Sequence, residues 1–237
     1  MKFIAISDTH CAEVPIPDGD VLLHAGDFTY RGNHPEVFEA ARWMKSLPHK
    51  SKIAVAGNHD RMAEKESGRF ADMMQEAGVH YLFDSGVVIS PEGKVSPWSP
   101  AGPEQPGIKI HGSPWQPEFC NWAFNLPRGA QLKEKWDLIP DSTDILITHG
   151  PAYGILDRAP RDGWEYGMSD EDLEMYSEKV GCWDMLQAIK RVKPKVHLFG
   201  HIHADYGVRE VGGTKHINAS IMDERYDPVN KPVEFEL

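Results

Sequence analysis

The sequence has few cysteines and no long apolar run, and each shortage excludes a class of protein. Its 3 cysteines, Cys11, Cys120 and Cys182, are odd in number and form no closely spaced pair. The sequence therefore predicts a protein of a reducing compartment that has no disulfide framework. The apolar start of the chain meets Asp8 almost at once, which is too short for a signal peptide, and no later run is long enough to cross a membrane. We expect a cytoplasmic protein without a membrane partner.

Basic residues are also scarce. The chain has 25 Lys and Arg against 36 Asp and Glu, a formal net charge of -11. Binding to a long polyanion depends mainly on basic side chains that neutralise phosphates, so no long nucleic acid is expected as a partner. A small anionic substrate that binds to a metal centre remains compatible with this charge. The 12 histidines are more than core packing demands, and their sequence neighbours indicate which of them bind metal.

The length and composition predict one compact domain over residues 1–237. A chain of 237 residues with 41% hydrophobic residues can bury a large core without disulfides. The sequence contains no internal repeat, low-complexity tract or linker that would separate a second domain.

The first third of the chain predicts the element order β, β, α, β, α. Short apolar runs without helical period predict buried strands over 2–7, 20–25 and 52–56. Apolar residues at helical spacing, with Pro35 near the start and Pro48 after the end, predict a helix over 34–47. A second helix is expected around 70–76, and Gly78 shortly after it is typical of a helix C-terminus.

The rest of the chain predicts short strands, one clear helix over 183–192 and two irregular stretches. A Pro/Gly-rich loop is expected over 91–107, and an acidic, partly mobile loop over 153–179 that is helical only around 170–178. Two packed mixed sheets flanked by helices follow from this order, an α/β fold with a four-layer α/β/β/α arrangement. Strands are predicted over 87–90, 108–112, 144–148, 195–199, 206–211, 214–218 and 233–237.

Five short polar motifs each follow a predicted strand directly. The carboxyl ends of strands in α/β sheets form one edge where ligands collect, so segments that are distant in sequence converge there. A single Asp-x-His is as well explained by a solvated loop, but five such motifs in this order favour one site. They are Asp8-Thr9-His10, Gly26-Asp27, Gly57-Asn58-His59-Asp60, His149-Gly150 and Gly200-His201-Ile202-His203.

The residue types in these motifs predict a pair of metal ions. Carboxylate, imidazole and amide ligands without thiolate suit Mn²⁺ or Fe²⁺/Fe³⁺, with Zn²⁺, Ni²⁺ and Co²⁺ as alternatives. Two ions about 3.5 to 4 Å apart need a bridging carboxylate and a bridging water, and Asp27 is the natural bridge. The glycines before Asp27, Asn58 and His201 permit tight turns beside a bound ion.

The motif series resembles the calcineurin-like metallophosphoesterase superfamily over most of the chain, from Asp8 to His203. Further segments resemble the metallophosphoesterase-domain-containing group, which is similar to class III cyclic nucleotide phosphodiesterases. These segments read LLHAGDFT, GSPW, FNLPRG, DILITHGP and INAS. The acidic stretch 162–178 is longer than that group leads us to expect, and it leaves the substrate size open.

The resemblance implies a role for each residue of the motifs. One ion would have the ligands Asp8, His10, Asp27 and His203, and the other would have Asp27, Asn58, His149 and His201. His59 would be the general acid for the leaving alkoxide, with Asp60 orienting its imidazole. The family pattern allows glycine in place of His201, so the complete set in this chain predicts an active enzyme.

Three further residues are candidates for substrate contact. Arg31 and Asn33 follow Asp27 closely and are equally well explained by a surface turn. His111 directly precedes Gly112, and the sequence favours a substrate contact and a structural role for it equally. Aromatic residues between Trp115 and Phe124 are better explained by core packing than by base stacking.

The sequence therefore predicts a dinuclear metal-dependent phosphodiesterase that acts on small phosphodiesters, with cyclic nucleotides (3′,5′ or 2′,3′) favoured by the group resemblance. Hydroxide held between two ions would attack phosphorus in line, and His59 would protonate the departing oxygen. The enzymatic alternatives are a phosphomonoesterase, a nucleotide pyrophosphatase or a nuclease on the same metal core. A non-catalytic nucleotide-binding sensor is the alternative from another class.

Overall fold

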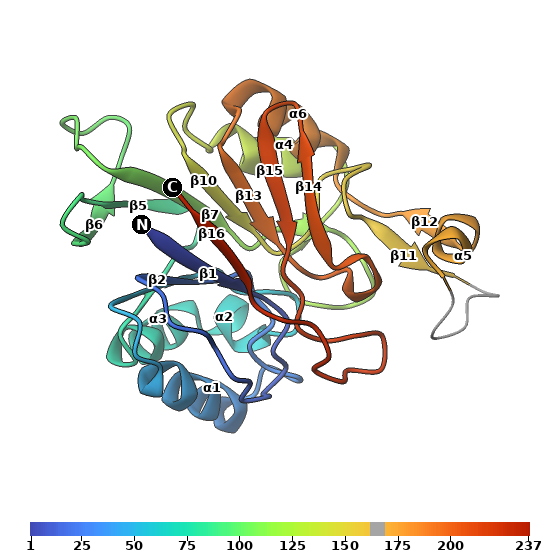
Figure 1. Cartoon of the computed structure of the whole chain (residues 1–237), viewed down its shortest axis with the longest axis horizontal. Coiled ribbons are helices and arrows are strands. Elements are labelled where there is room, and N and C mark those ends of the chain that lie inside the picture. Colours follow the sequence, from blue (N-terminus) through green and yellow to red (C-terminus); the bar gives the residue numbers. More distant parts are fainter. Residues whose placement is uncertain (162–168) are drawn as a thin grey trace.

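Two β-sheets pack face to face in the computed structural model, which describes residues 1–161 and 169–237 (Figure 1). The first sheet has the order β16 (Val233–Glu236), β1 (Lys2–Ile6), β2 (Val21–His24), β3 (Ser51–Ala54) and β4 (Val79–Tyr81). The second has the order β14 (Gly207–Val211), β15 (Thr214–Asn218), β13 (Val196–Phe199), β10 (Ile145–Thr148), β7 (Ile108–Ser113), β5 (Ser85–Ile89) and β6 (Val95–Trp98).

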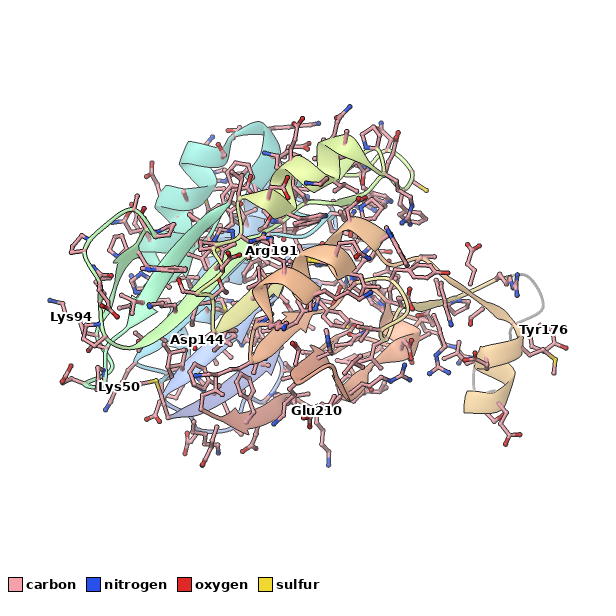
Figure 2. All side chains as sticks on the ribbon, turned by 90° about the horizontal axis from the view of Figure 1, so that it is seen from above. Lys50, Lys94, Asp144, Tyr176, Arg191 and Glu210 are labelled. Carbon is pink, nitrogen blue, oxygen red and sulfur yellow. The ribbon has the colours of Figure 1, made fainter. Side chains whose placement is uncertain are left out.

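Helices cover the outer face of each sheet, which confirms the predicted α/β/β/α layers. Figure 1 shows α1 (His34–Ser46), α2 (Arg61–Lys65) and α3 (Ser67–Glu76) on the first sheet, and α4 (Ala130–Asp137) and α6 (Trp183–Val192) on the second. The view from above shows α6 lying along the second sheet (Figure 2). Helix α1 begins where the Asn33 side chain accepts a hydrogen bond from the Glu36 N–H, and its inner face buries Val37 and Met44.

The core between the sheets is apolar because strands buried on both faces need apolar side chains in each direction. Phe3 and Ile53 of the first sheet belong to the same buried cluster as Ile147 and Leu198 of the second. Full burial of each such side chain stabilises the fold by about 1.5 to 3 kcal/mol. The outward side chains of the same strands pack under the helices in two further clusters.

Parallel pairing brings the carboxyl ends of the motif-bearing strands together. Strand β1 is parallel to β2, which is parallel to β3, and in the other sheet β10 is parallel to β13. The two sheets join at this edge, where Ser7 forms a parallel bridge with Ser220. The strand pairing therefore brings the motif-bearing loops to one edge of the sheets, where the sequence predicts that they converge.

The structure corrects the predicted loops. The 91–107 segment contains β6, which pairs with β5, and the helices α2 and α4 were not predicted. The 153–179 segment contains the antiparallel strands β11 (Arg158–Pro160) and β12 (Ser177–Lys179) and the helix α5 (Asp170–Met175). Figure 2 shows this hairpin, with Tyr176, projecting from one end of the molecule. Residues 162–168, part of the predicted acidic loop, lie outside the described residues.

The missed strands have a common physical cause. Each missed strand is short, and its pairing depends on a partner strand that local sequence does not identify. None of the helices in the described part of the chain has the length and apolar composition that a membrane crossing requires.

Candidate metal centre

The loops after the strands adopt backbone conformations that non-glycine residues rarely adopt. Asp8, His10, Asp27 and His201 have φ values of 54°, 42°, 56° and 68°. Such left-handed backbone costs free energy, and it occurs mainly where the surrounding structure enforces it at functional sites. Gly200 is required for a different reason, because a Cβ there would collide with the Asp8 carboxylate and the Ser7 side chain.

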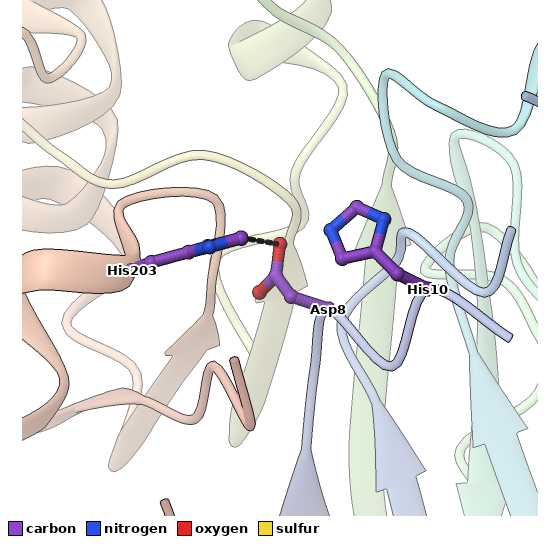
Figure 3. A group of neighbouring side chains, drawn as sticks. All are labelled: Asp8, His10 and His203. Carbon is purple, nitrogen blue, oxygen red and sulfur yellow. Dashed lines mark ion pairs between the residues drawn. The ribbon is translucent and has the colours of Figure 1, made fainter. Parts of the chain in front are cut away.

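Aspartate and histidine side chains from these loops form three overlapping clusters. Within each cluster the ligand atoms lie within 4.8 Å of one another. Figure 3 shows the first cluster, in which His203 Nε2 lies 3.5 Å from Asp8 Oδ1 with His10 on the other side of the carboxylate. The clusters are Asp8, His10 and His203; His10, Asp27 and His59; and Asp8, Asp27 and His149.

Asp27 lies between the two sides of this centre. Its Oδ2 is 3.3 Å from His149 Nε2 and 3.8 Å from His10 Nε2. Each of these histidines belongs to the ligand set of a different ion in the family pattern, so this position suits a bridging carboxylate. The position of Asp27 is compatible with a bridging role, which stays a prediction.

Asn58 and His201 lie on the His149 side of the centre. Asn58 Oδ1 is 2.8 Å from His149 Nε2, and the His201 ring centroid is 5.0 Å from that of His149. The His201 backbone N–H lies 3.1 and 3.0 Å from the two Asp8 oxygens and donates to this carboxylate. His201 is outside the three clusters, but all the predicted ligands lie together.

Three histidines are oriented by backbone carbonyls. The Nδ1 atoms of His10, His149 and His203 lie 3.0, 2.9 and 2.9 Å from the carbonyl oxygens of Thr29, Ala25 and Asp223. A ring that donates from Nδ1 presents an unprotonated Nε2, the form that binds a metal ion.

The residues present fit a metal pair. The Nε2 atom of His10 is buried and has no hydrogen-bond partner among the described residues, an arrangement that costs about 1 to 3 kcal/mol unless another group satisfies it. A divalent cation beside Asp8 and Asp27 would satisfy this nitrogen. The donor set is oxygen and imidazole nitrogen without thiolate, which suits the hard and intermediate ions predicted from the sequence.

The two aspartates are ionised at neutral pH although they are buried. Burial opposes their charge, but His203 holds the pKa of Asp8, and His149 that of Asp27, well below the usual range. Burial lowers the pKa of both His149 and His203 and the aspartates raise it, with a net rise to about 9. Without a metal both rings are therefore protonated at neutral pH, and a bound cation would displace the Nε2 proton. Two buried carboxylates in charged form are what a pair of cations requires.

His59 lies against this centre and is held on two sides. Its Nδ1 is 2.6 Å from the Tyr30 carbonyl oxygen, and its ring stacks on Trp122 with centroids 4.1 Å apart. Its backbone N–H donates to Asp27 Oδ1 at 2.7 Å. The imidazole is therefore positioned by Tyr30 and Trp122.

The predicted role of Asp60 is wrong. Its carboxylate accepts hydrogen bonds from the backbone N–H groups of Gly57, Phe28 and Thr29 and from the Thr29 hydroxyl. These donors belong to the turns after β2 and β3, and they occupy the carboxylate, so the His59 Nδ1 turns to the Tyr30 carbonyl instead. Asp60 holds the two turns together; burial and the charge of Asp27 raise its pKa to about 6.

A pocket of about 490 Å³ opens onto the centre. Five predicted site residues line it, namely Asp27, Asn58, His59, His201 and His203. Its other walls include residues that the sequence did not identify as site residues: Phe119, Arg128, Ala159, Pro160, Glu178, Val180, Glu224 and Tyr226. No motif marks these positions, because they come from three segments that only the tertiary structure brings together.

The three candidate substrate contacts lie outside this lining. Asn33 caps α1 and exchanges hydrogen bonds with Glu36, and His111 is buried within β7. Neither lines the pocket, and their contact with a substrate stays a prediction. For both residues the sequence favoured a structural role and a substrate contact equally, and the structure gives both side chains structural roles. Arg31 is exposed, and its role stays a prediction.

The fold and the site together define a metallophosphoesterase. The calcineurin-like phosphoesterase family matches residues 1–205, and this chain belongs to that family. Metallophosphoesterase domain-containing protein 1 of Homo sapiens and its Mus musculus counterpart are each 41% identical over 248 residues, which cover 100% of this chain and 71% of theirs.

More distant proteins are also similar to this chain. A UPF0046 protein of Caenorhabditis elegans is 35% identical over 255 residues, which cover 100% of this chain and 60% of that protein. The crystal structure of TT1561 of Thermus thermophilus has the same fold, with a TM-score of 0.52 at 13% identity over 92% of this chain and 88% of that one. Family membership and the buried Asp/His clusters indicate a phosphoester hydrolase with a dinuclear metal site.

Proposed function

We propose that this protein is a metal-dependent phosphodiesterase that hydrolyses small phosphodiesters, with cyclic nucleotides as the substrate class to test first. The observation that carries the proposal is the position of His59, whose ring lines the pocket beside the Asp8, Asp27 and His149 cluster. An acid held at a metal centre suits an ester whose alkoxide leaving group needs a proton.

The surroundings of His59 support its role as the acid. Because Nδ1 is held by the Tyr30 carbonyl, the other ring nitrogen, Nε2, carries the transferable proton when the imidazole is charged. Stacking on Trp122 fixes the plane of the ring. When bound, a metal pair supplies a water nucleophile at neutral pH and neutralises charge on the phosphoryl oxygens.

The pocket supports a small substrate. Its volume of about 490 Å³ lies within the range of about 300 to 1,000 Å³ that is typical of small-molecule sites. Phe119 and Tyr226 provide aromatic surface in the wall, which suits a nucleobase or a similar group. The net charge of -11 is unfavourable for a nucleic-acid polymer.

The test is hydrolysis of bis-p-nitrophenyl phosphate by metal-stripped protein with and without added Mn²⁺. The wild type is compared with His59→Ala and with the surface variant His34→Ala. Turnover that Mn²⁺ restores in wild type and in His34→Ala supports the proposal, and His59→Ala should lose far more activity toward a cyclic nucleotide than toward bis-p-nitrophenyl phosphate. Screening of 3′,5′ and 2′,3′ cyclic nucleotides then follows.

Two other results would replace the proposal. A higher kcat/KM for p-nitrophenyl phosphate than for every diester would identify a phosphomonoesterase. Nucleotide binding without turnover by the Mn²⁺-loaded protein would identify a nucleotide sensor.

A further inference from the structure

The segment between β15 and β16 crosses from one sheet to the other beside the metal centre. Figure 1 shows it as the long red loop that leaves the end of β15 and returns to β16. It starts at the Ser7 to Ser220 bridge, at the sheet edge where the metal-centre loops meet. Tyr226 lies in this segment.

The turn that carries Tyr226 is tightly built. Asp223 Oδ1 accepts the backbone N–H of Arg225 at 2.8 Å and that of Asp227 at 2.9 Å. The Tyr226 N–H donates to the Asp223 carbonyl oxygen at 3.0 Å, and His203 Nδ1 lies 2.9 Å from the same oxygen. The turn is therefore attached directly to a predicted metal ligand.

Tyr226 itself adopts a strained backbone conformation. Its φ of 63° is rare for a bulky residue, and such strain is concentrated at functional sites and ligand clamps. The hydrogen bonds of Asp223 hold the turn in this conformation. The structure thus maintains a costly geometry that directs one aromatic ring to the pocket.

The Tyr226 ring packs against the metal-centre histidines. Its centroid lies 4.8 Å from that of His10, 5.2 Å from that of His203 and 6.2 Å from that of His59. The His10 and His203 rings flank Asp8 in Figure 3, so the phenol ring lies beside the first cluster. Tyr226 also lines the pocket and is 39% exposed.

The phenol hydroxyl has no hydrogen-bond partner among the residues that the structure describes. The Tyr206 hydroxyl, in contrast, donates to the Lys231 carbonyl oxygen at 2.8 Å. Tyr226 and His59 line the same pocket with their ring centroids 6.2 Å apart, so a phosphoryl group held between the metal centre and His59 would lie beside Tyr226. A protonated phenol there is a suitable donor to an anionic oxygen.

We propose that Tyr226 is a substrate-binding residue whose hydroxyl donates a hydrogen bond to a phosphoryl oxygen of the substrate. This inference rests on the proposed phosphoesterase function. It assigns phosphate recognition to a segment that lies outside the five sequence motifs.

The test compares Tyr226→Phe with wild type and with the control Tyr206→Phe, all loaded with Mn²⁺. Tyr226→Phe removes only the hydroxyl and keeps the ring that packs on the histidines. It should weaken the binding of inorganic phosphate, measured by calorimetry, by about tenfold, since a hydrogen bond to a charged group is lost. The kcat/KM for bis-p-nitrophenyl phosphate should fall by a similar factor, while metal content and melting temperature stay those of wild type.

Tyr206→Phe should bind phosphate as wild type does, because its hydroxyl contacts the backbone of Lys231 and does not line the pocket. Wild-type phosphate affinity in Tyr226→Phe would overturn the inference, and so would loss of metal from that variant, which would assign Tyr226 to ligand support. If the wild type hydrolyses no phosphoester, the proposed function fails. The phosphate affinities still test the role of Tyr226 in that case.

Discussion

At the scale of single residues, His59 differs from the other histidines of the centre. The Nδ1 atoms of His10, His149 and His203 are also held by carbonyls, but those rings lie among the buried aspartates of the centre. His59 stacks on Trp122 and lines the open pocket. His203 also lines the pocket, and His59 also clusters with His10 and Asp27, so the stacking on Trp122 is the feature that distinguishes His59.

Replacement of His59 by alanine should therefore affect chemistry more than metal binding. We expect kcat to fall by about 100-fold or more for cyclic nucleotides, whose alkoxide leaving group needs a proton. The loss should be smaller for bis-p-nitrophenyl phosphate, whose p-nitrophenolate leaves without help. Steady-state kinetics with both substrates, together with metal analysis, checks this. Equal losses for the two substrates would remove His59 from the acid role.

His111 gives the protein a sensitivity to acid that is separate from catalysis. Burial lowers its pKa to about 4, and its Nε2 has no hydrogen-bond partner among the described residues. The unfolded chain, with an ordinary histidine pKa of about 6.5, binds the proton more readily than the folded protein does. The contribution of His111 to stability is therefore complete above about pH 6.5 and decreases as the pH falls toward about 4.

The variant His111→Leu should remove this component. Over that pH range it should retain up to about 3 kcal/mol of unfolding free energy that the wild type loses. Urea unfolding at several pH values between 4 and 7 measures the difference. Parallel stability curves for the two proteins would contradict the assignment.

At the scale of elements, the β11–β12 hairpin forms one wall of the pocket and is attached at both strands. The Arg158 guanidinium donates to the Asp205 carboxylate at 2.6 Å, and Asp205 is only 2% exposed. After β12, Arg128 donates to the carbonyl oxygens of Gly181 at 2.7 Å and Val180 at 2.5 Å. Because Asp205 lies two residues after His203, the hairpin is connected to the metal centre.

The Arg158→Ala variant should destabilise this wall strongly. It leaves the buried Asp205 charge without its partner, a change that typically costs about 3 to 5 kcal/mol. We expect a lower melting temperature and a higher KM, since Ala159 and Pro160 of β11 line the pocket. Arg42→Ala is the matched control, because Arg42 forms only exposed ion pairs with Glu13 and Glu39. Equal melting temperatures for the two variants would show that the pair does not anchor the hairpin.

At the scale of the whole molecule, the metal centre joins the two sheets. Asp8 and Asp27 follow strands of the first sheet, whereas His149 and His203 follow strands of the second. A ligand held by both sheets binds the folded protein and not the unfolded chain. Metal binding should therefore contribute to global stability.

Mn²⁺ at about 100 times its dissociation constant should stabilise the wild type by about 2.7 kcal/mol for each site. Calorimetric melting temperatures with EDTA and with Mn²⁺ measure this effect. In Asp27→Ala the increase should be largely lost, because Asp27 lies between His10 and His149. The same increase in Asp27→Ala as in wild type would refute a shared ligand.

The sequence alone determined the layers of the fold, the order of its long elements and the residues that converge at the metal centre. These follow from local causes: apolar runs predict buried strands, Pro35 and Pro48 delimit α1, and polar motifs mark the strand ends. Only the tertiary structure decided that Asp60 holds the turns and that Tyr30 and Trp122 orient His59. It also decided that Arg158 anchors the β11–β12 hairpin to Asp205 and that Tyr226 lines the pocket. Those roles depend on which side chains meet across the sheets, and distances between residues that are far apart in sequence arise only when the chain packs.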